Sequence, residues 1–153
     1  MSGDQPSGGA SLERGPIAIL LVEDNPIDVK AALRAARQLE IVNRIEVAES
    51  GEAALDRIRQ PERDAPPPDL VLLDLDLPGK HGLEVLAELK GDPALRRIPV
   101  VILTTSAADS DIAAAYDLGA NAYVTKPLGL DAWRTLARQI EGFWFGTAQL
   151  PPG

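Results

Sequence analysis

The 153-residue chain contains no cysteine and only one histidine, His81. Disulfide bonds, thiol chemistry and metal sites built from several histidines are therefore excluded. No apolar run approaches the roughly 20 residues that span a bilayer as a helix. The N-terminus also lacks the apolar core of a signal peptide. These absences predict a protein that works in the cytoplasm and does not insert into a membrane.

Positive charge is also scarce, with 15 Lys and Arg against 23 Asp and Glu and a net charge of −8. This balance argues against binding to nucleic acid or to an anionic membrane through bulk electrostatics. The length is sufficient for one domain with its own core. We expect a disordered Gly/Ser/Pro-rich tail over 1–15, a folded domain over 16–142, and an aromatic and Pro-rich extension over 143–153.

Five stretches have the pattern of β-strands, and helical patterns alternate with them. The expected strands are Ile17–Val22, Asn43–Ala48, Leu70–Leu73, Pro99–Leu103 and Asn121–Thr125. Alternation of this kind predicts a parallel sheet with helices on both faces and right-handed crossovers. We therefore predict an α/β, flavodoxin-like (βα)5 fold, doubly wound, with strand order 2-1-3-4-5.

Acidic side chains follow the first and third predicted strands. Glu23 and Asp24 come after the first strand, and Asp74 ends the third. These strands are neighbours in the predicted order, so the three carboxylates should share one crevice. Crowded carboxylates are costly to ionise without a cation, and an all-oxygen ligand set favours Mg²⁺. The sequence therefore predicts a magnesium site.

The fourth and fifth strands end in a hydroxyl group and an ammonium group, those of Thr104 and Lys126. Together with the cation, these groups suit phosphoryl transfer to Asp74. Mg²⁺ and Lys126 can neutralise the equatorial oxygens, and Thr104 can donate a hydrogen bond. Aspartyl phosphates are an established class of covalent intermediate.

At these residues the chain resembles the receiver domains of two-component response regulators. The acidic pair, the acceptor, Thr104, Lys126-Pro127 and the Pro78 to Gly82 turn appear in the order of that family. The separations of 30 residues from Asp74 to Thr104 and 22 from Thr104 to Lys126 also fit. The resemblance implies a protein that catalyses its own phosphorylation and dephosphorylation and is not a conventional enzyme.

The resemblance also implies partners and ligands. A histidine kinase is expected to phosphorylate Asp74, and Mg²⁺ is expected on Glu23, Asp24, Asp74 and the backbone carbonyl of Asp76. By analogy with the family, the basic helical face of Lys30, Arg34 and Arg37 is a candidate kinase contact. No output domain follows the receiver pattern, so signalling is expected to pass through a partner, a dimer or a shared kinase.

Two regulatory roles are expected near the site. Tyr123 stands where receiver domains carry a switch aromatic, which follows Thr104 inward after phosphorylation. The alternative is a strand aromatic with its hydroxyl in water. Asp76 and Ser106 are candidates for tuning the phosphoryl lifetime, although Asp76 can also be a solvated turn residue.

Four of the six aromatic residues lie near the C-terminus: Trp133, Phe143, Trp144 and Phe145. With Ile140 they form a seam that favours a symmetric homodimer through the last helix and the extension. The alternative is that they fold back on their own domain. This tail, the Pro-rich loop before the Asp74 strand, and the runs Leu103–Ala107 and Tyr116–Pro127 resemble response regulators associated with phytochromes and bacteriophytochromes, which implies a light-sensing kinase.

Three other functions compete with this interpretation. Asp74 and Asp76 also resemble the paired aspartates of haloacid-dehalogenase-like phosphatases, but that family places the pair after its first strand. An FMN-binding flavodoxin needs a hydroxyl-rich phosphate loop, whereas the first loop here is acidic. A degenerate receiver acting only as a binding module is the third alternative.

Overall fold

The computed structural model describes residues 16–60 and 66–152 of the chain. The tail expected over 1–15 and the middle of the Pro-rich loop therefore lie outside the described residues. Within them, no helix combines the length and the apolar character needed to cross a bilayer.

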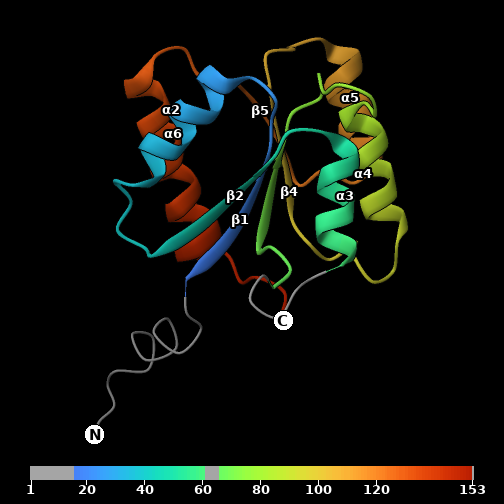
Figure 1. The fold of residues 1–153 in the computed structure, drawn as a ribbon, viewed down its shortest axis with the longest axis horizontal. Helices are drawn as coiled ribbons and strands as arrows, with labels where there is room; N and C mark the ends of the chain where they lie inside the picture. The colour runs from blue at the N-terminus through green and yellow to red at the C-terminus, as the bar shows by residue number, and fades with distance from the viewer. Residues whose placement is uncertain (1–15, 61–65, 153) are drawn as a thin grey trace, which may run out of the picture.

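Five parallel strands form one sheet in the order β2-β1-β3-β4-β5 (Figure 1). The strands are β1 (Ile17–Val22), β2 (Asn43–Ala48), β3 (Leu70–Leu73), β4 (Val100–Thr104) and β5 (Ala122–Thr125). The predicted flavodoxin-like fold and strand order are confirmed. The three central strands are buried along their whole length, whereas edge strand β2 is mostly half-buried, with Arg44 exposed and Ala48 buried.

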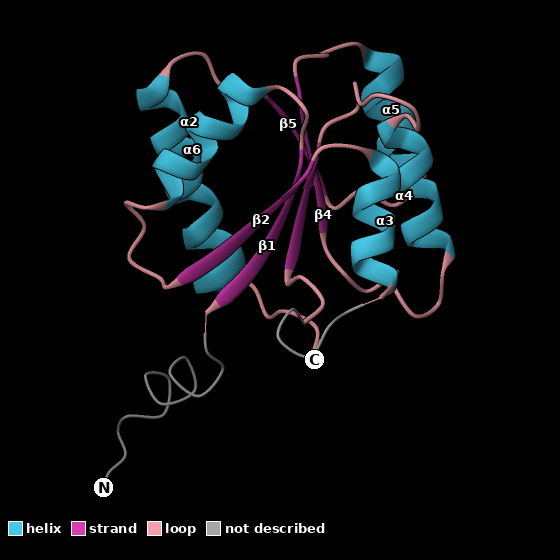
Figure 2. Cartoon of the chain, in the orientation of Figure 1, coloured by secondary structure: helices cyan, strands magenta, loops and turns pink. Residues whose placement is uncertain are grey.

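Helices cover both faces of the sheet, as Figure 2 shows. They are α2 (Pro26–Ala36), α3 (Gly51–Arg59), α4 (Gly82–Gly91), α5 (Asp109–Asp117) and α6 (Leu130–Gly142). Helices α2 and α6 pack together on one face, while α3, α4 and α5 form the layer on the other. A single π-helical turn, η1 (Phe143–Thr147), continues α6.

Short polar side chains start several of these helices. The Asn25 side chain accepts hydrogen bonds from the backbone N–H groups of Ile27 and Asp28, and Pro26 occupies the first helical position of α2. Both features satisfy or remove backbone donors that a helix start leaves without partners. His81, to which the sequence assigned no role, caps α4: its Nδ1 accepts from Leu83 N, and the Glu84 carboxylate accepts from His81 N.

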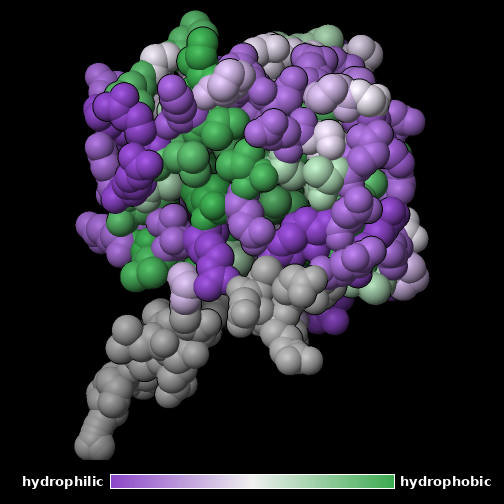
Figure 3. Space-filling view, viewed as in Figure 1, coloured by the Kyte–Doolittle hydropathy of each residue, from purple (hydrophilic) through white to green (hydrophobic). Residues whose placement is uncertain are grey.

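The core differs between the two faces. The α3–α5 side forms one large apolar cluster around Val71, Leu73 and Ile102. The α2–α6 side is divided into two clusters, and its smaller one contains the buried indole of Trp133. Figure 3 shows apolar side chains gathered over β2, between the helical layers. The acidic loops at the carboxyl end of the sheet thus stand on a rigid apolar base.

Candidate functional site

Strand register brings the acidic residues together. Val22 pairs with Leu73, and Asp74 N donates a hydrogen bond to Val22 O at 3.1 Å. Glu23 and Asp74 therefore leave neighbouring strands at the same level. Carboxylate oxygens of Glu23, Asp24 and Asp74 all lie within 4.8 Å of one another. Glu23 and Asp74 are buried, whereas Asp24 is exposed.

Lys126 is held above Asp74 by backbone and side-chain contacts. Its N–H donates to Thr104 O at 2.8 Å, which extends the pairing of β5 with β4. Its Nζ lies 2.6 Å from Glu23 Oε1, 2.8 Å from Asp28 Oδ2 and 3.3 Å from Asp74 Oδ2. The sequence predicted the grouping of Lys126 with Glu23 and Asp74 but missed Asp28.

Asp28 lies in the first turn of α2, four residues after Asp24. An acidic residue in the first turn of a helix is common because it suits the helix dipole, so this position carried no functional signal of its own. Sequence alone did not indicate that Asp28 turns toward the end of β5.

Burial controls the protonation of these groups. Burial raises the pKa of Glu23 to about 7, and the charge of Asp74 adds to this effect, although hydrogen bonds from Lys126 and Asn25 oppose it. Burial alone would lower the pKa of Lys126, but its bonds to Asp28 and Glu23 and the charge of Asp74 together raise it above its usual value. Lys126 is therefore a permanent cation in a pocket with excess negative charge.

Thr104 brings a hydroxyl to the same pocket. It is fully buried, and within the described part of the chain its Oγ1 has no hydrogen-bond partner. A buried hydroxyl without a partner costs about 1 to 3 kcal/mol. An oxygen-rich group bound beside Asp74 could accept from this hydroxyl and remove the cost. The three carboxylates and this hydroxyl are also the oxygen donors that a hard divalent cation and a phosphoryl group require.

The turn after β3 brings the start of α4 against Asp74. Gly82 N donates to Leu75 O at 2.9 Å. A Cβ on Gly82 would overlap Asp74 O and lie 2.6 Å from Leu75 Cα. Only glycine permits this close approach, so the Pro78 to Gly82 turn fixes the backbone of the predicted phosphate acceptor.

The predicted switch residue is connected to the loop after β4. The hydroxyl of Tyr123 donates to Ser106 O at 2.9 Å and is therefore not simply in water. The Ser106 hydroxyl donates to Asp111 Oδ2 at 2.6 Å. Ser106 thus bonds to α5 and not to the acidic cluster. Tyr123 and Ser106 lie together, and their predicted roles remain predictions.

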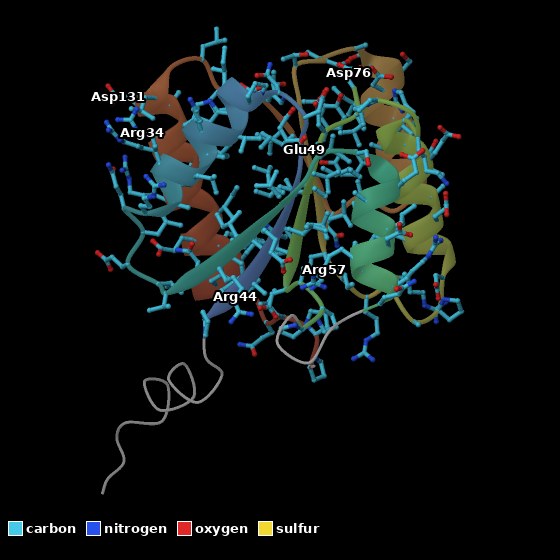
Figure 4. The ribbon with its side chains drawn as sticks, in the orientation of Figure 1. Arg34, Arg44, Glu49, Arg57, Asp76 and Asp131 are labelled. Carbon is cyan, nitrogen blue, oxygen red and sulfur yellow. The ribbon has the colours of Figure 1, made fainter. Side chains whose placement is uncertain are left out.

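Asp76 lies at the carboxyl end of the sheet, where Figure 4 labels it. Its side chain is exposed, and its backbone N–H donates to Asp74 Oδ1 at 3.4 Å. That bond orients the acceptor carboxylate. Cation binding by the Asp76 carbonyl and an effect of its side chain on phosphoryl lifetime stay predictions.

The residues predicted for the dimer lie away from this pocket. Trp133 packs between Ala35 and Leu103 in the core of its own domain, so it has little surface to offer a second copy. Ile140 and Trp144 are half-buried against the α2–α6 face of the sheet. Phe143 is 53% exposed and makes an edge-to-face contact with Trp144. Much of the aromatic seam therefore packs on its own domain, and the dimer remains a prediction.

Known proteins resemble this chain in sequence and in fold. Response regulator Rcp1 of Synechocystis sp. (strain ATCC 27184 / PCC 6803 / Kazusa) is 41% identical over 138 residues, covering 89% of this chain and 94% of the relative. The crystal structure of its Mn²⁺-bound form has a TM-score of 0.82 and covers 90% of this chain and 100% of that chain at 41% identity. The probable methanogenesis regulatory protein FilR2 of Methanothrix harundinacea (strain 6Ac) is 40% identical over 146 residues, covering 95% and 94% of the two chains.

A second structure links the fold to a phosphorylated protein. The phosphorylated cyanobacterial phytochrome response regulator RcpA has a TM-score of 0.84 at 42% identity, with 90% of this chain and 100% of that chain covered. The family model described as the response regulator receiver domain matches residues 19–138. This chain therefore belongs to the response regulator receiver domain family and is related to phytochrome response regulators.

Proposed function

We propose that the protein accepts a phosphoryl group on Asp74 from a histidine kinase in a Mg²⁺-dependent reaction. The observation that carries this proposal is the position of Asp74. Its carboxylate lies in the three-carboxylate cluster and 3.3 Å from Lys126 Nζ. The protein is in this view a phospho-acceptor of a signalling relay and not a conventional enzyme.

Each residue of the pocket has a chemical task in the transfer. The P–N bond of the phosphohistidine breaks, its electron pair stays on the imidazole, and an Asp74 oxygen forms the new O–P bond. Lys126 stabilises negative charge on a phosphoryl oxygen, and the Thr104 hydroxyl donates to another. When bound by Glu23, Asp24, Asp74 and the Asp76 carbonyl, Mg²⁺ would neutralise further charge on the transferred group.

Signal output is proposed to begin at Thr104 and Tyr123. A phosphoryl oxygen gives the Thr104 hydroxyl a partner, which draws this side chain toward Asp74. Tyr123 then exchanges its bond to Ser106 O for the space that Thr104 leaves. Because Ser106 is also bonded to Asp111, this exchange changes the loop before α5.

The kinase is proposed to bind beside the pocket. Lys30 and Arg34 are exposed on α2, and Arg37 is exposed at the C-cap of that helix. Ile27 directly precedes Asp28, and Leu128 lies two residues after Lys126. Their side chains are 76% and 93% exposed, close in sequence to the two partners of the Asp28–Lys126 bridge. Similarity to RcpA favours a phytochrome-type kinase such as a bacteriophytochrome, although FilR2 is nearly as similar in sequence.

A homodimer through α6 and the extension, with the exposed Phe143 in contact, completes the proposal.

Phosphorylation by phosphoramidate tests the proposal without a kinase. Wild-type protein with Mg²⁺ is expected to gain one phosphate by intact mass, whereas Asp74→Asn and chelated wild type gain none. Asp76→Asn is the matched control, because it removes the neighbouring carboxylate. It should still be phosphorylated, with a changed lifetime.

Three outcomes would contradict this function. Phosphate gain by Asp74→Asn would place the acceptor elsewhere. Steady turnover of a phosphomonoester such as p-nitrophenyl phosphate would instead indicate the phosphatase alternative. Mg²⁺ binding without any phosphate gain would indicate a degenerate receiver that acts as a binding module.

A further inference from the structure

Lys126 has three N–H donors and three carboxylate neighbours. The contacts of Nζ with Glu23 Oε1 and Asp28 Oδ2 are short, at 2.6 and 2.8 Å, while the contact with Asp74 Oδ2 is 3.3 Å. Two strong charge-assisted bonds fix the ammonium group, and the third donor points along the long contact toward the phosphate acceptor. The position of Lys126 over Asp74 thus depends on Glu23 and Asp28.

These two carboxylates are not equivalent. Among the described residues, the acidic groups close enough to share a cation are Glu23, Asp24 and Asp74, and Asp28 is outside that group. If Glu23, Asp24 and Asp74 held a cation, it would compete with Lys126 for the Glu23 carboxylate. Asp28 is then the carboxylate that serves Lys126 alone.

The start of α2 makes Asp28 a rigid support. Asn25 caps the helix, and Pro26 fixes its first turn, so the backbone at Asp28 is well defined. The side chain of Asp28 is 21% exposed, and that of Lys126 is 7% exposed. The bond is therefore largely shielded from solvent and correspondingly strong, and Asp28 can still be substituted without opening the core.

We propose that Asp28 is a positioning residue for phosphoryl transfer, which holds the Lys126 ammonium so that one N–H meets the phosphoryl oxygen arriving at Asp74. The inference rests on the proposed function of Asp74. It predicts a dependence of the transfer rate on a residue that contacts neither the phosphoryl group nor the cation.

With phosphoramidate as the donor, the leaving group is ammonia. The P–N bond of phosphoramidate, whose nitrogen is already protonated in its zwitterionic form, breaks with its electron pair on the departing ammonia, and an Asp74 carboxylate oxygen forms the O–P bond of the acyl phosphate. Lys126 keeps its protons throughout and stabilises charge on the transferred group. Asp28 takes part only by holding Lys126.

The experiment compares phosphorylation rates of the full chain at saturating Mg²⁺, followed by intact mass. Asp28→Ala is expected to be about tenfold slower, which is the usual cost of removing a residue that orients a catalytic group. Asp28→Asn, which keeps an oxygen acceptor without the charge, should lie between Asp28→Ala and wild type. Asp28→Glu should restore most of the rate.

The direction of the change separates positioning from simple charge. Phosphoramidate is an anion, so deleting a carboxylate by charge alone would speed its reaction. Asp109→Ala deletes an exposed carboxylate near the same end of the sheet and should leave the rate close to that of wild type or slightly above it. Thermal unfolding of each variant establishes that the folded protein is being compared.

An Asp28→Ala rate equal to or above wild type would overturn the inference. A second result would also overturn it: Asp28→Ala and Asp28→Glu both react slowly, while the isosteric Asp28→Asn reacts at the wild-type rate. Failure of the proposed function has a different signature, in which wild type gains no phosphate or Asp74→Asn gains as much as wild type.

Discussion

Two partly buried lysines stand at opposite ends of the sheet and have opposite surroundings. Lys126, at the carboxyl end, faces three carboxylates. Lys90, at the amino end, donates to Arg96 O at 3.0 Å, Ile98 O at 2.8 Å and Asn121 Oδ1 at 3.2 Å. Burial lowers the pKa of Lys90, whereas the carboxylates raise that of Lys126.

The different partners of the two lysines indicate a structural role for Lys90 and a chemical role for Lys126. Lys90 joins the end of α4 to the segments that enter β4 and β5, and its partners are neutral. Lys126 is a cation in a pocket that still carries excess negative charge and a buried hydroxyl without a partner. The acceptors around Lys90 satisfy its three donors, whereas the pocket of Lys126 is arranged for a cation and an oxygen-rich group.

The largest expected effect is on phosphoryl transfer. Lys126→Met should slow phosphorylation by phosphoramidate about 100-fold or more, because it removes one of the charges that stabilise the transition state. Lys90→Met should leave the rate unchanged. Both rates are measured by intact mass at saturating Mg²⁺. A similar loss in the two variants would show that the comparison between the lysines is wrong.

A pair of glycines provides a second test. Gly82→Ala should lower the free energy of unfolding by about 3 kcal/mol, because its Cβ meets rigid backbone at Asp74 and Leu75. Gly119→Ala should cost about 1 to 2 kcal/mol, from its φ of +105° and a 3.0 Å contact with the flexible Lys90 Cγ. Urea denaturation measures both values.

The control for this pair is Gly91→Ala at the end of α4, where a Cβ meets nothing within 4 Å. It should change stability little or raise it slightly. If Gly119→Ala lowered the free energy of unfolding more than Gly82→Ala, the backbone around Gly82 would adjust to a Cβ more easily than its contacts indicate.

The smallest effect concerns pH. The folded-state pKa of Lys90 is below its usual 10.5, so the folded protein binds fewer protons than the unfolded chain as the pH approaches that value. Stability contributed by Lys90 therefore rises with pH in this range. The difference in unfolding free energy between wild type and Lys90→Met should grow toward pH 10.5. A flat difference in urea titrations would contradict the lowered pKa.

Residues at strand ends could be predicted from the sequence because apolar runs define where each buried strand stops. Glu23, Asp74 and Thr104 followed from that rule, and the sheet order then placed them together. Asp28 could not be found in the same way, since its bond to Lys126 joins residues 98 apart and depends on how α2 is rotated.

The role of His81 was missed because histidine is an uncommon helix cap. For Trp133, periodicity predicted an apolar helical face but did not identify its partner. The structure shows that this partner is the domain's own sheet and α2.

The pairing of Val22 with Leu73 has a further consequence for how this sequence can vary. Successive residues of a strand point to opposite faces, so one inserted or deleted residue in β1 or β3 would reverse the side chains beyond it. Apolar substitutions within these strands preserve the count, and changes of length in the connections between elements do not disturb it. The site therefore tolerates apolar substitution in its supporting strands far better than insertions or deletions there.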